Sequence, residues 1–447
     1  MSKDLTTGSV LKNLIYFCIP YLFSYFLQTL YGMADLFIVG QFCGVESTTA
    51  VSIGSQVMHM ITVIIVGLAM GTTVTIGQAI GAKDNKKSSK SVGNSITLFA
   101  IFSIVLTVIL LLIRKNIVSI MSTPVEAFSG TVDYLTICFI GIPFITAYNI
   151  ISSIFRGLGD SKRPMYFVMV ACVLNIVLDY LFIGYFNLGP SGAALGTTLS
   201  QACSVLISLI VIRKIDTGIH LHKEDLKVDS QLMKGILKIG CPIAVQDGLI
   251  QIAFIIITVI ANKRGLNDAA AVGIVEKIIS FIFLVPSSML STVSALGAQN
   301  IGAGKIQRAK QTLYYAIGIT VCFGLVIGLI MQVAAGSVVS LFTESENVIS
   351  LGDQYLKGYI WDALFAGIHF SFSGYFCACG KSIYSFIHNI IAIALVRVPL
   401  VYLASTTFTD TLYPMGLATA SGSLLSSIIC VILFIILNKK EKQNEKN

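Results

Sequence analysis

Long apolar segments with almost no charged residues recur along this chain, and they limit its possible folds more than any other feature. Examples are residues 95–113, 167–183 with their flanks, and 416–437. A helix needs about 20 apolar residues to cross ~30 Å of hydrocarbon, and a spanning helix satisfies its backbone hydrogen bonds within the segment. The sequence therefore predicts an all-α polytopic membrane protein.

Composition excludes the other fold classes. Of the 447 residues, 55% are hydrophobic and 12% are charged, and the mean hydropathy is +0.84, whereas a soluble domain carries about 25% charged residues. The apolar segments are continuous and do not alternate with polar residues, which argues against a transmembrane β-barrel. The first segment, residues 14–39, is too long for the apolar region of a signal peptide, so we expect it to be the first span.

The segments predict twelve transmembrane helices in two six-helix lobes. We expect an N-terminal lobe at residues 1–213, a charged linker at 214–233, and a C-terminal lobe at 234–447. The spans lie near residues 14–39, 49–79, 92–113, 129–155, 164–186 and 191–212 in the first half, and near 235–261, 269–299, 312–336, 352–376, 384–404 and 414–437 in the second.

Lysine and arginine are distributed unevenly between the loops. With both termini on one side, twenty-three of the thirty basic residues fall on that side, five fall on the other, and Lys277 and Arg397 fall within spans. The positive-inside rule places the basic side, with both termini, in the cytoplasm of a cell-membrane protein. These loops also account for the net charge of +8, so we expect no nucleic-acid partner.

An internal repeat connects the two halves. At an offset of 221, Gly44 falls on Gly265, and residues 78–82 (QAIGA) fall on residues 299–303 (QNIGA). Each half contains an even number of spans, so both halves insert in the same direction and the pseudo-twofold axis runs along the membrane normal. Two lobes related in this way are expected to enclose a central cavity, which is typical of a transporter.

Several motifs resemble those of the multidrug and toxic compound extrusion (MATE) family, within the MOP flippase superfamily. The resemblance covers essentially the whole chain and is densest in the first half. The matching segments are residues 27–35 (LQTLYGMAD), 77–83 (GQAIGAK), 156–162 (RGLGDSK), 175–179 (NIVLD), 192–197 (GAALGT) and 397–400 (RVPL).

The resemblance implies a secondary antiporter that exports amphipathic, often cationic compounds in exchange for H⁺ or Na⁺ by alternating access. It also implies a cation-coupling site at Asp35, Asn175 and Asp179, with Thr197 as a nearby hydroxyl. Gln28 and Tyr31, which lie in the first matching segment, are candidate residues for the substrate cavity.

Physical chemistry leads to the same acids. A charged carboxylate at the bilayer centre costs about 2.5–3.5 kcal/mol on insertion scales, so each buried acid needs a partner or a function. Asn175 precedes Asp179 by four residues and shares its helix face. Two acids and an amide at one cavity can exchange a proton for a hard cation, whereas the alternative is that each acid caps a helix or extends to the interface. For Asp35 and Asp179 we favour the functional interpretation.

The second half offers less decisive candidates. Asp247 lies between Gln246 and Gln251, which either contact substrate or hold the acid in place. For Glu276, an ion pair with Lys277 is a serious alternative to substrate contact. His369 is a further cavity candidate that can titrate, although packing is the simpler explanation.

Three other residues have structural interpretations. Arg397 lies within a span and must find a carboxylate or carbonyls, so we expect it to brace the second lobe. Asp362 follows the single tryptophan and suits an interfacial anchor as well as a site. Pro20 provides a bend point in the first span.

The closest rival function is a flippase for lipids or lipid-linked oligosaccharides, which is expected to have a strongly basic cavity. An enzyme is disfavoured, because no HExxH or GxSxG motif and no spaced His/Cys ligand set is present. We therefore expect no metal site and no cofactor. The expected partners are a small amphipathic substrate, the coupling cation and the lipid bilayer, and the protein is expected to be a monomer.

Overall fold

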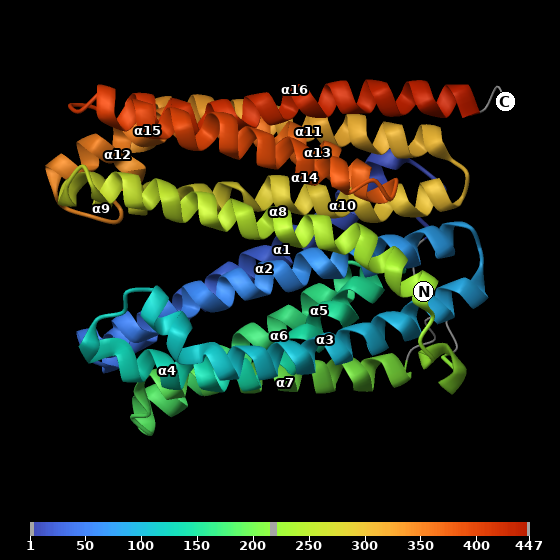
Figure 1. The fold of residues 1–447 in the computed structure, drawn as a ribbon, viewed down its shortest axis with the longest axis horizontal. Coiled ribbons are helices and arrows are strands. Elements are labelled where there is room, and N and C mark those ends of the chain that lie inside the picture. Colours follow the sequence, from blue (N-terminus) through green and yellow to red (C-terminus); the bar gives the residue numbers. More distant parts are fainter. Residues whose placement is uncertain (1–3, 215–220, 445–447) are drawn as a thin grey trace. The chain divides into compact units, whose positions relative to one another are not determined.

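A computed structural model describes residues 4–214 and 221–444, and these residues form helices joined by short loops, with no strand among them. Figure 1 shows the helices labelled in chain order. Their bounds are α1 Val10–Phe42, α2 Val45–Gly81, α3 Asn85–Ile120, α4 Val125–Ile140, α5 Ile142–Gly157, α6 Lys162–Asp179, η1 Tyr180–Tyr185, α7 Gly189–Lys214, η2 Lys223–Leu226, α8 Ser230–Asn262, α9 Leu266–Ile282, α10 Leu284–Gly302, α11 Ile306–Val339, α12 Glu346–Tyr359, α13 Asp362–Ala378, α14 Ile383–Ala392, η3 Ile393–Arg397, α15 Val398–Thr407 and α16 Tyr413–Asn444.

The described helices confirm the predicted fold class. Ten helices are long and apolar enough to cross a membrane, and the pair α4 and α5, bent by 48°, is an eleventh span. We infer that the pair α12 and α13 is the twelfth span from the repeat, because an offset of 221 carries the start of α4 at Val125 onto Glu346 and the end of α5 at Gly157 onto Ala378. Each predicted span lies inside one of these helices or pairs, except that 164–186 extends one residue beyond the end of η1 at Tyr185.

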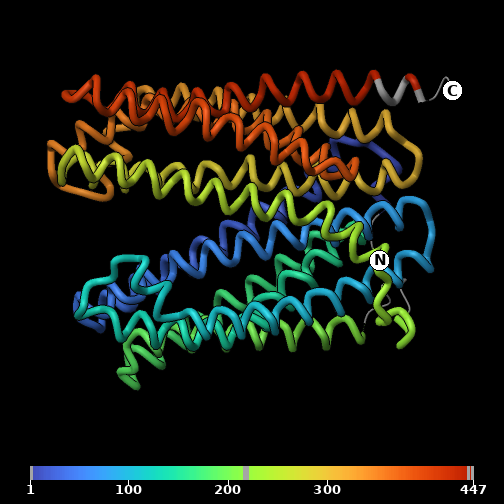
Figure 2. The backbone as a smooth tube through the Cα atoms, in the orientation of Figure 1, coloured from blue at the N-terminus to red at the C-terminus, as the bar shows by residue number. Residues whose placement is uncertain are grey.

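Prolines affect the helices in two ways. Pro20 lies inside α1 and Pro242 inside α8, and both helices continue through these residues (Figure 2). The hydroxyl of Ser24 donates a hydrogen bond to the Pro20 carbonyl, four residues earlier in α1, at 2.8 Å. By contrast, Pro143 lies in the first turn of α5, directly after the 48° bend.

Many large apolar side chains are exposed, as expected for lipid-facing helices. Leu112 on α3 is 77% exposed and Val333 on α11 is 88% exposed, and the two positions differ by the repeat offset of 221. A membrane provides no hydrophobic penalty for such exposure. The same face of the same span therefore meets lipid in both halves.

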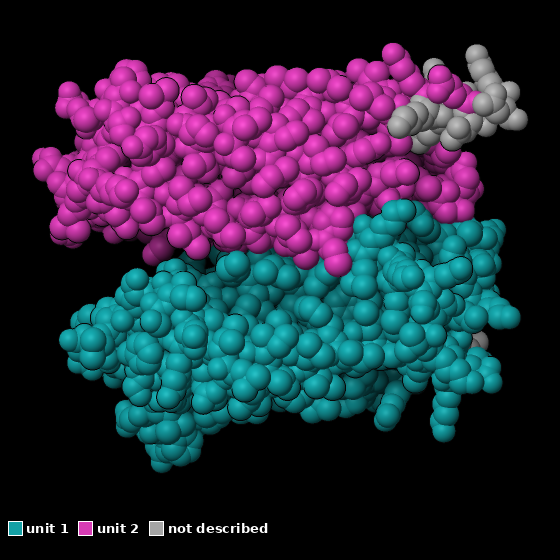
Figure 3. Space-filling model, viewed as in Figure 1, with its two compact units in different colours: residues 1–5, 16–240 teal, residues 6–15, 241–447 magenta. Residues whose placement is uncertain are grey.

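The chain divides into two compact units, coloured separately in Figure 3. Unit 1 consists of residues 1–5 and 16–240, and unit 2 of residues 6–15 and 241–447. The division falls inside α8, whose first turns belong to unit 1 because Gly240 meets the backbone of α2. A Cβ atom at Gly240 would lie 2.3 Å from the Leu68 carbonyl oxygen.

The predicted linker, 214–233, is described in part, since residues 215–220 lie outside the described residues. Its short helix η2 docks on α3. The side chain of Asn94 donates to the Asp225 carbonyl at 3.3 Å and accepts from the Asp229 backbone N–H at 2.8 Å. Gly93 makes room for this contact, because a Cβ atom there would lie 2.2 Å from the Asp225 carbonyl oxygen.

The same close helix crossing occurs in both units. The glycine at the crossing lies on the second helix of the pair in unit 1 and on the first helix in unit 2. In unit 1, Gly157 on α5 packs on Ile76 of α2, and a Cβ atom at Gly157 would lie 2.9 Å from the Ile76 Cβ. The positions 221 residues later hold Ala378 on α13 and Gly297 on α10, where a Cβ atom at Gly297 would lie 2.7 Å from the Ala378 Cβ. Small residues allow such approach, and close packing is a main source of helix association in membranes.

A second close crossing holds α12 against α16 in unit 2. A Cβ atom at Gly416 would lie 2.4 Å from the Tyr355 carbonyl oxygen, and one at Gly358 would lie 2.5 Å from the Tyr413 carbonyl oxygen. Both glycines meet rigid backbone atoms. Neither helix can accept even a methyl group at this crossing without moving.

We expect Gly416→Ala to destabilise unit 2 by about 1–3 kcal/mol, because the added methyl group overpacks the crossing. Gly318→Ala is the matched control: Gly318 lies on an exposed face of α11 with no atom close to its Cβ position. Thermal unfolding of the detergent-solubilised proteins tests this, and equal melting temperatures for the two variants would contradict it.

Candidate functional site

The predicted coupling residues converge inside unit 1 from three helices. Asp35 lies in α1, Asn175 and Asp179 lie at the end of α6, and Thr197 lies in α7. Asp35 is 3% exposed, Asn175 is 1% exposed and Asp179 is fully buried. Side chains that are 162 residues apart in sequence are thus brought within hydrogen-bond distance.

Hydrogen bonds join these four side chains into one cluster. The Thr197 hydroxyl donates to Asp35 Oδ2 at 3.1 Å, and Asn175 Nδ2 donates to Asp179 Oδ2 at 3.5 Å. The Asp35 carboxyl also lies near the side chains of Asp179 and Asn175. We call these four residues the acid cluster.

Three buried oxygens of the acid cluster have no hydrogen-bond partner among the described residues. They are Asp35 Oδ1, Asn175 Oδ1 and Asp179 Oδ1. Carboxylate and amide oxygens are ligands for hard cations, and two neighbouring buried carboxylates repel each other unless a positive charge or a proton lies between them. The cluster can therefore hold a proton or a small cation.

Local backbone features position Asp179. The helix changes to a π-helix at Tyr180, directly after the acid, and π-segments are frequent at functional sites. Gly196 on α7 faces the carboxyl group, and a Cβ atom there would lie 2.1 Å from Asp179 Oδ1. Only glycine lets α7 approach this closely.

The predicted cavity residues of unit 1 lie beside the acid cluster. Tyr31 lies near Asp35, Tyr148 and Gln201, and Gln28 lies near Tyr148. Tyr31 and Gln28 are partly exposed, whereas Tyr148 is buried. Gln28 and Tyr31 form a polar face of α1, which lies near Tyr148 of α5 and Gln201 of α7.

In unit 2, Arg397 forms a buried ion pair with Asp362. The Asp362 side chain is fully buried, and one nitrogen of the guanidinium group donates to Asp362 Oδ2. Arg397 Nε also donates to the Thr419 carbonyl at 3.2 Å, and the guanidinium group lies 5.9 Å from the Phe254 ring centroid. Gly422 makes room for this side chain, since a Cβ atom there would lie 2.8 Å from the Arg397 Cβ.

Unit 1 holds no charge at the corresponding place. Asp362 corresponds to Gly141, and Arg397 corresponds to Ile176. Gly141 is closely packed, because a Cβ atom there would lie 2.7 Å from the side chain of Thr198. The ion pair therefore belongs to unit 2 alone, where it joins α13 to η3 and α16.

The other second-half candidates do not form one cluster. Gln246 is buried and its Nε2 donates to Asp247 Oδ1 at 3.5 Å, while Gln251 is partly exposed one turn further along α8. Glu276 accepts from the Thr258 hydroxyl at 3.3 Å, whereas Lys277 is exposed. Neighbouring residues on a helix do not face each other, so the ion pair considered for Glu276 and Lys277 does not form.

Two buried histidines lie together in unit 2, and one of them was missed from the sequence. The predicted residue, His369, is 5% exposed and its Nδ1 has no partner among the described residues. Its ring lies 5.5 Å from that of His388, which bonds Ser373 through Nε2 at 2.9 Å and Ser426 through Nδ1 at 3.0 Å. His388 carried no sequence signal, since it stands alone in an apolar segment.

The described residues are 4–214 and 221–444. No group of three or more His, Cys, Asp or Glu side chains in these ranges is arranged to hold a metal ion. The acid cluster has only two such side chains, and its other ligands are an amide and a hydroxyl.

Comparison with known proteins gives consistent matches along the chain. The family model described as MatE matches residues 20–181 and 242–403. A probable multidrug resistance protein, YoeA of Bacillus subtilis, is 29% identical over 404 residues, covering 89% of this chain and 87% of that protein. The multidrug export protein MepA of Staphylococcus haemolyticus is 25% identical over 97% of this chain and 95% of that protein.

Solved structures share the fold. The outward-facing conformation of a multidrug resistance MATE family transporter of the MOP superfamily superposes with a TM-score of 0.92, at 23% identity over 98% of both chains. A MOP superfamily transporter from Pyrococcus furiosus, reported with a binding pocket of reverse polarity, superposes with a TM-score of 0.90, at 24% identity over 96% of both chains.

We expect Gly196→Ala to displace the Asp179 carboxyl, because the new methyl group would overlap Oδ1. Infrared spectra of protein with ¹³C-labelled aspartate carboxyls should then show a shifted carboxyl band. Gly32→Ala in α1, where nothing lies near the Cβ position, is the control. An unchanged band in the Gly196 variant would show that the cluster tolerates the methyl group.

We expect Asp362→Ala to destabilise unit 2 by about 3–5 kcal/mol, because it leaves Arg397 as a buried charge without its carboxylate. Replacing both partners, as Asp362→Leu with Arg397→Met, should restore much of the loss, since a buried pair often exchanges for apolar residues at little cost. Thermal unfolding measures both. A double variant less stable than the single one would refute this explanation.

Proposed function

The chain belongs to the MatE family, and we propose that it is a secondary antiporter that exports amphipathic, often cationic compounds in exchange for H⁺ or Na⁺ by alternating access. The family match covers both halves of the chain, and relatives aligned over most of their length are named multidrug resistance or multidrug export proteins. Drug export is thus supported at the level of the family, whose members are transporters rather than enzymes.

The acid cluster is the observation that carries the proposed ion coupling. Two buried carboxyls lie near each other and have three unpartnered oxygens beside them. Binding of one proton or one monovalent cation relieves the repulsion between the acids and supplies a partner for those oxygens. We assign this role to Asp35, Asn175 and Asp179, with Thr197 holding Asp35.

Coupling follows from the place of Asp35 on α1. The same helix carries Gln28 and Tyr31, so a change at the acid cluster alters the face that these residues present to a substrate. Each of the two, ion and substrate, then lowers the affinity for the other. The coupling free energy is positive, and it is reciprocal by thermodynamic linkage. Uptake of the ion releases the substrate.

Unit 2 contributes substrate contacts in this proposal. Gln246, Asp247 and Gln251 offer donors and an acid along α8, and Glu276 and His369 offer further polar atoms within the same unit. Arg397 has a different role, because its contacts with Asp362 and the Thr419 carbonyl satisfy it and brace the helices.

The protein is a multi-pass membrane protein that acts on small molecules. We further propose that it lies in the cell membrane as a monomer with both termini in the cytoplasm, as the loop charges indicate. A flippase for lipid-linked oligosaccharides is the alternative. The pair of buried acids in unit 1 favours export of cationic compounds instead.

We expect Asp35→Asn to lower the efflux of a fluorescent cation by about tenfold, a typical size for coupling between two sites. Asp133→Asn is the matched control, since Asp133 is an exposed acid of unit 1 on α4. Initial efflux rates from cells expressing equal amounts of each protein measure the effect. Unchanged efflux in the Asp35 variant would refute the assignment, and proteoliposomes under imposed pH or sodium gradients identify the ion.

A further inference from the structure

The first helix of each half changes units near its start. Residues 6–15, which include the start of α1, belong to unit 2, whereas α1 from Tyr16 onward belongs to unit 1. Residues 230–240, at the start of α8, belong to unit 1, and the rest of α8 belongs to unit 2. Each of these two helices therefore has residues in both units.

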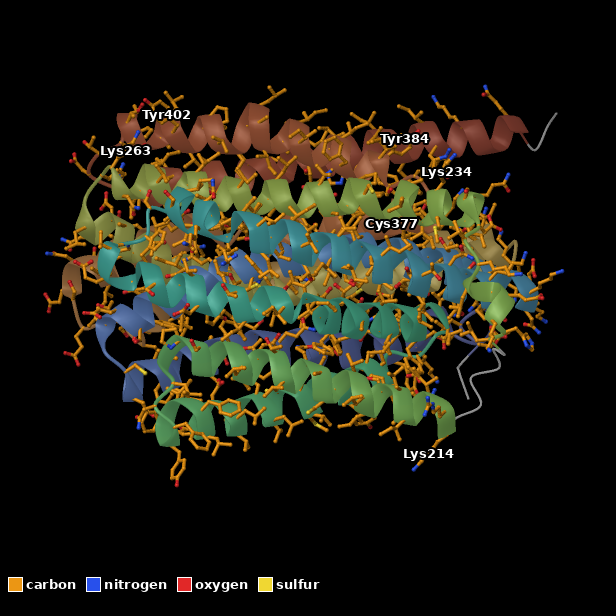
Figure 4. The ribbon with its side chains drawn as sticks, turned by 60° about the horizontal axis from the view of Figure 1, so that its bottom comes forward. Lys214, Lys234, Lys263, Cys377, Tyr384 and Tyr402 are labelled. Carbon is orange, nitrogen blue, oxygen red and sulfur yellow. The ribbon has the colours of Figure 1, made fainter. Side chains whose placement is uncertain are left out.

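Close backbone packing fixes the start of α8 in unit 1. A Cβ atom at Gly71 of α2 would lie 2.1 Å from the Ile236 carbonyl oxygen, and Gly240 makes the same kind of contact with α2. Lys234, near this start, lies at the end of unit 1 that also carries Lys214 (Figure 4), which is the end that we propose to be cytoplasmic. The two helices cannot separate here without breaking contacts between their backbones.

The start of α1 lacks this packing. At an offset of 221, Gly71 corresponds to Thr292, and Gly240 corresponds to Ile19. Both of these residues are larger than glycine, and Ile19 is 49% exposed. A backbone contact of the kind that fixes α8 therefore does not form at the start of α1.

Side chains that follow α10 hold the start of α1 instead. Lys305 Nζ donates to the Thr6 carbonyl at 2.8 Å. The Arg308 guanidinium group donates to the Gly8 carbonyl at 3.0 Å and to the Thr7 carbonyl at 3.2 Å. All of these residues belong to unit 2. We call the three residues that supply the carbonyl groups the N-terminal strap.

Arg308 is the centre of these contacts. Its Nε donates to Asn300 Oδ1 at 3.2 Å, which fixes the guanidinium group on the end of α10. Asn13 Nδ2 of α1 donates to the same Thr7 carbonyl at 2.8 Å. Thr7 and Gly8 are exposed, so water can replace the guanidinium group at their carbonyls. Each such exchange of hydrogen bonds costs only a modest net free energy.

Unit 1 has the same place without these contacts. At an offset of 221, Arg308 corresponds to Lys87. Lys305 corresponds to Asp84, which caps α3 by accepting from the Lys87 backbone N–H at 2.9 Å. Both line a cavity of about 270 Å³ together with Asp229, which precedes α8. The Lys87 side chain forms no hydrogen bond with any described residue. The repeated fold therefore accommodates this place both closed and open.

We propose that the N-terminal strap is a latch that opens and closes during transport, and that Arg308 is the positioning residue that keeps it closed. The inference rests on the proposed alternating access. A displacement of one unit against the other must strain α1 and α8 or open one of their attachments. The least stable contacts open first, and these are the exposed hydrogen bonds of the strap.

The latch decides which unit the start of α1 moves with. When it is closed, the start of α1 moves with unit 2. When it is open, the start of α1 follows the remainder of the helix, which belongs to unit 1 and carries Asp35. The start of α8 has no such freedom, because backbone packing fixes it in unit 1.

Hydrogen exchange of the full-length protein in nanodiscs, measured by mass spectrometry, tests the latch without requiring transport. In the wild-type protein we expect the amides of residues 13–15 to have protection factors at least about tenfold below those of residues 234–236, their counterparts in α8. The reason is that opening of the strap exposes the start of α1, whereas the start of α8 stays packed.

We expect Arg308→Gln to lower the protection of residues 13–15 by about a further tenfold, the size expected for hydrogen bonds to a charged group. Arg308→Lys should lower it less, because lysine keeps the charge but loses the planar fork of donors. Lys381→Gln is the control, since it removes an exposed lysine of unit 2 whose side chain bonds no described residue. It should leave the protection unchanged.

A reversible crosslink tests whether the latch must open. In the double variant Thr7→Cys with Arg308→Cys, the two thiols lie within about the length of an arginine side chain, and a bis-methanethiosulfonate reagent joins them. We expect crosslinking to reduce ethidium transport in proteoliposomes at least about tenfold and dithiothreitol to restore it. Each single cysteine variant, treated in the same way, controls for the native cysteines.

Other outcomes overturn the inference. Equal protection at the two helix starts, or unchanged protection in Arg308→Gln, means that Arg308 holds no latch. A crosslinked protein that transports ethidium at its uncrosslinked rate means that the strap is a permanent attachment. A wild-type protein that transports no ethidium under any ion gradient refutes the proposed function, and equal protection at the two helix starts is then the result that refutes the latch.

Discussion

Hydrocarbon offers no hydrogen-bond partners, and this constraint governs every polar side chain in the protein. Apolar residues face outward, as Leu112 and Val333 do, and polar residues turn inward and pair. Arg397 and Asp362 satisfy each other in unit 2, and Thr197 satisfies one oxygen of Asp35 in unit 1. Buried polar groups that have no hydrogen-bond partner therefore indicate candidate ligand sites. An unpaired buried polar group costs free energy unless a ligand supplies the missing partner.

The two units share one six-helix pattern and one close helix crossing, but different residues form that crossing in each unit. The crossing of Ile76 with Gly157 in unit 1 recurs as Gly297 with Ala378 in unit 2. The separation of two helices depends on the combined size of the facing side chains, so the small residue can lie on either helix. This freedom allowed the units to keep one fold while their buried charges diverged.

The sequence predicted the twelve spans because each is long and apolar enough to identify locally. It also predicted the residues of the acid cluster, partly because Asn175 and Asp179 share a helix face and partly through the family resemblance. It did not reveal that Arg397 pairs with Asp362, or that Gly196 makes room for Asp179. These contacts join residues on different helices, and no local pattern records which helix lies opposite.

The sequence by itself determined that this is a twelve-span, duplicated membrane protein with Asp35 and Asp179 inside spans of its first half, because length, hydropathy, loop charge and repeat offset are properties of the linear chain. The tertiary structure decided which polar groups meet. It brought Asp35 on α1 to Asp179 on α6, and it paired Arg397 with Asp362. The physical reason is that burial and pairing depend on distances between helices, which close packing sets and sequence separation does not.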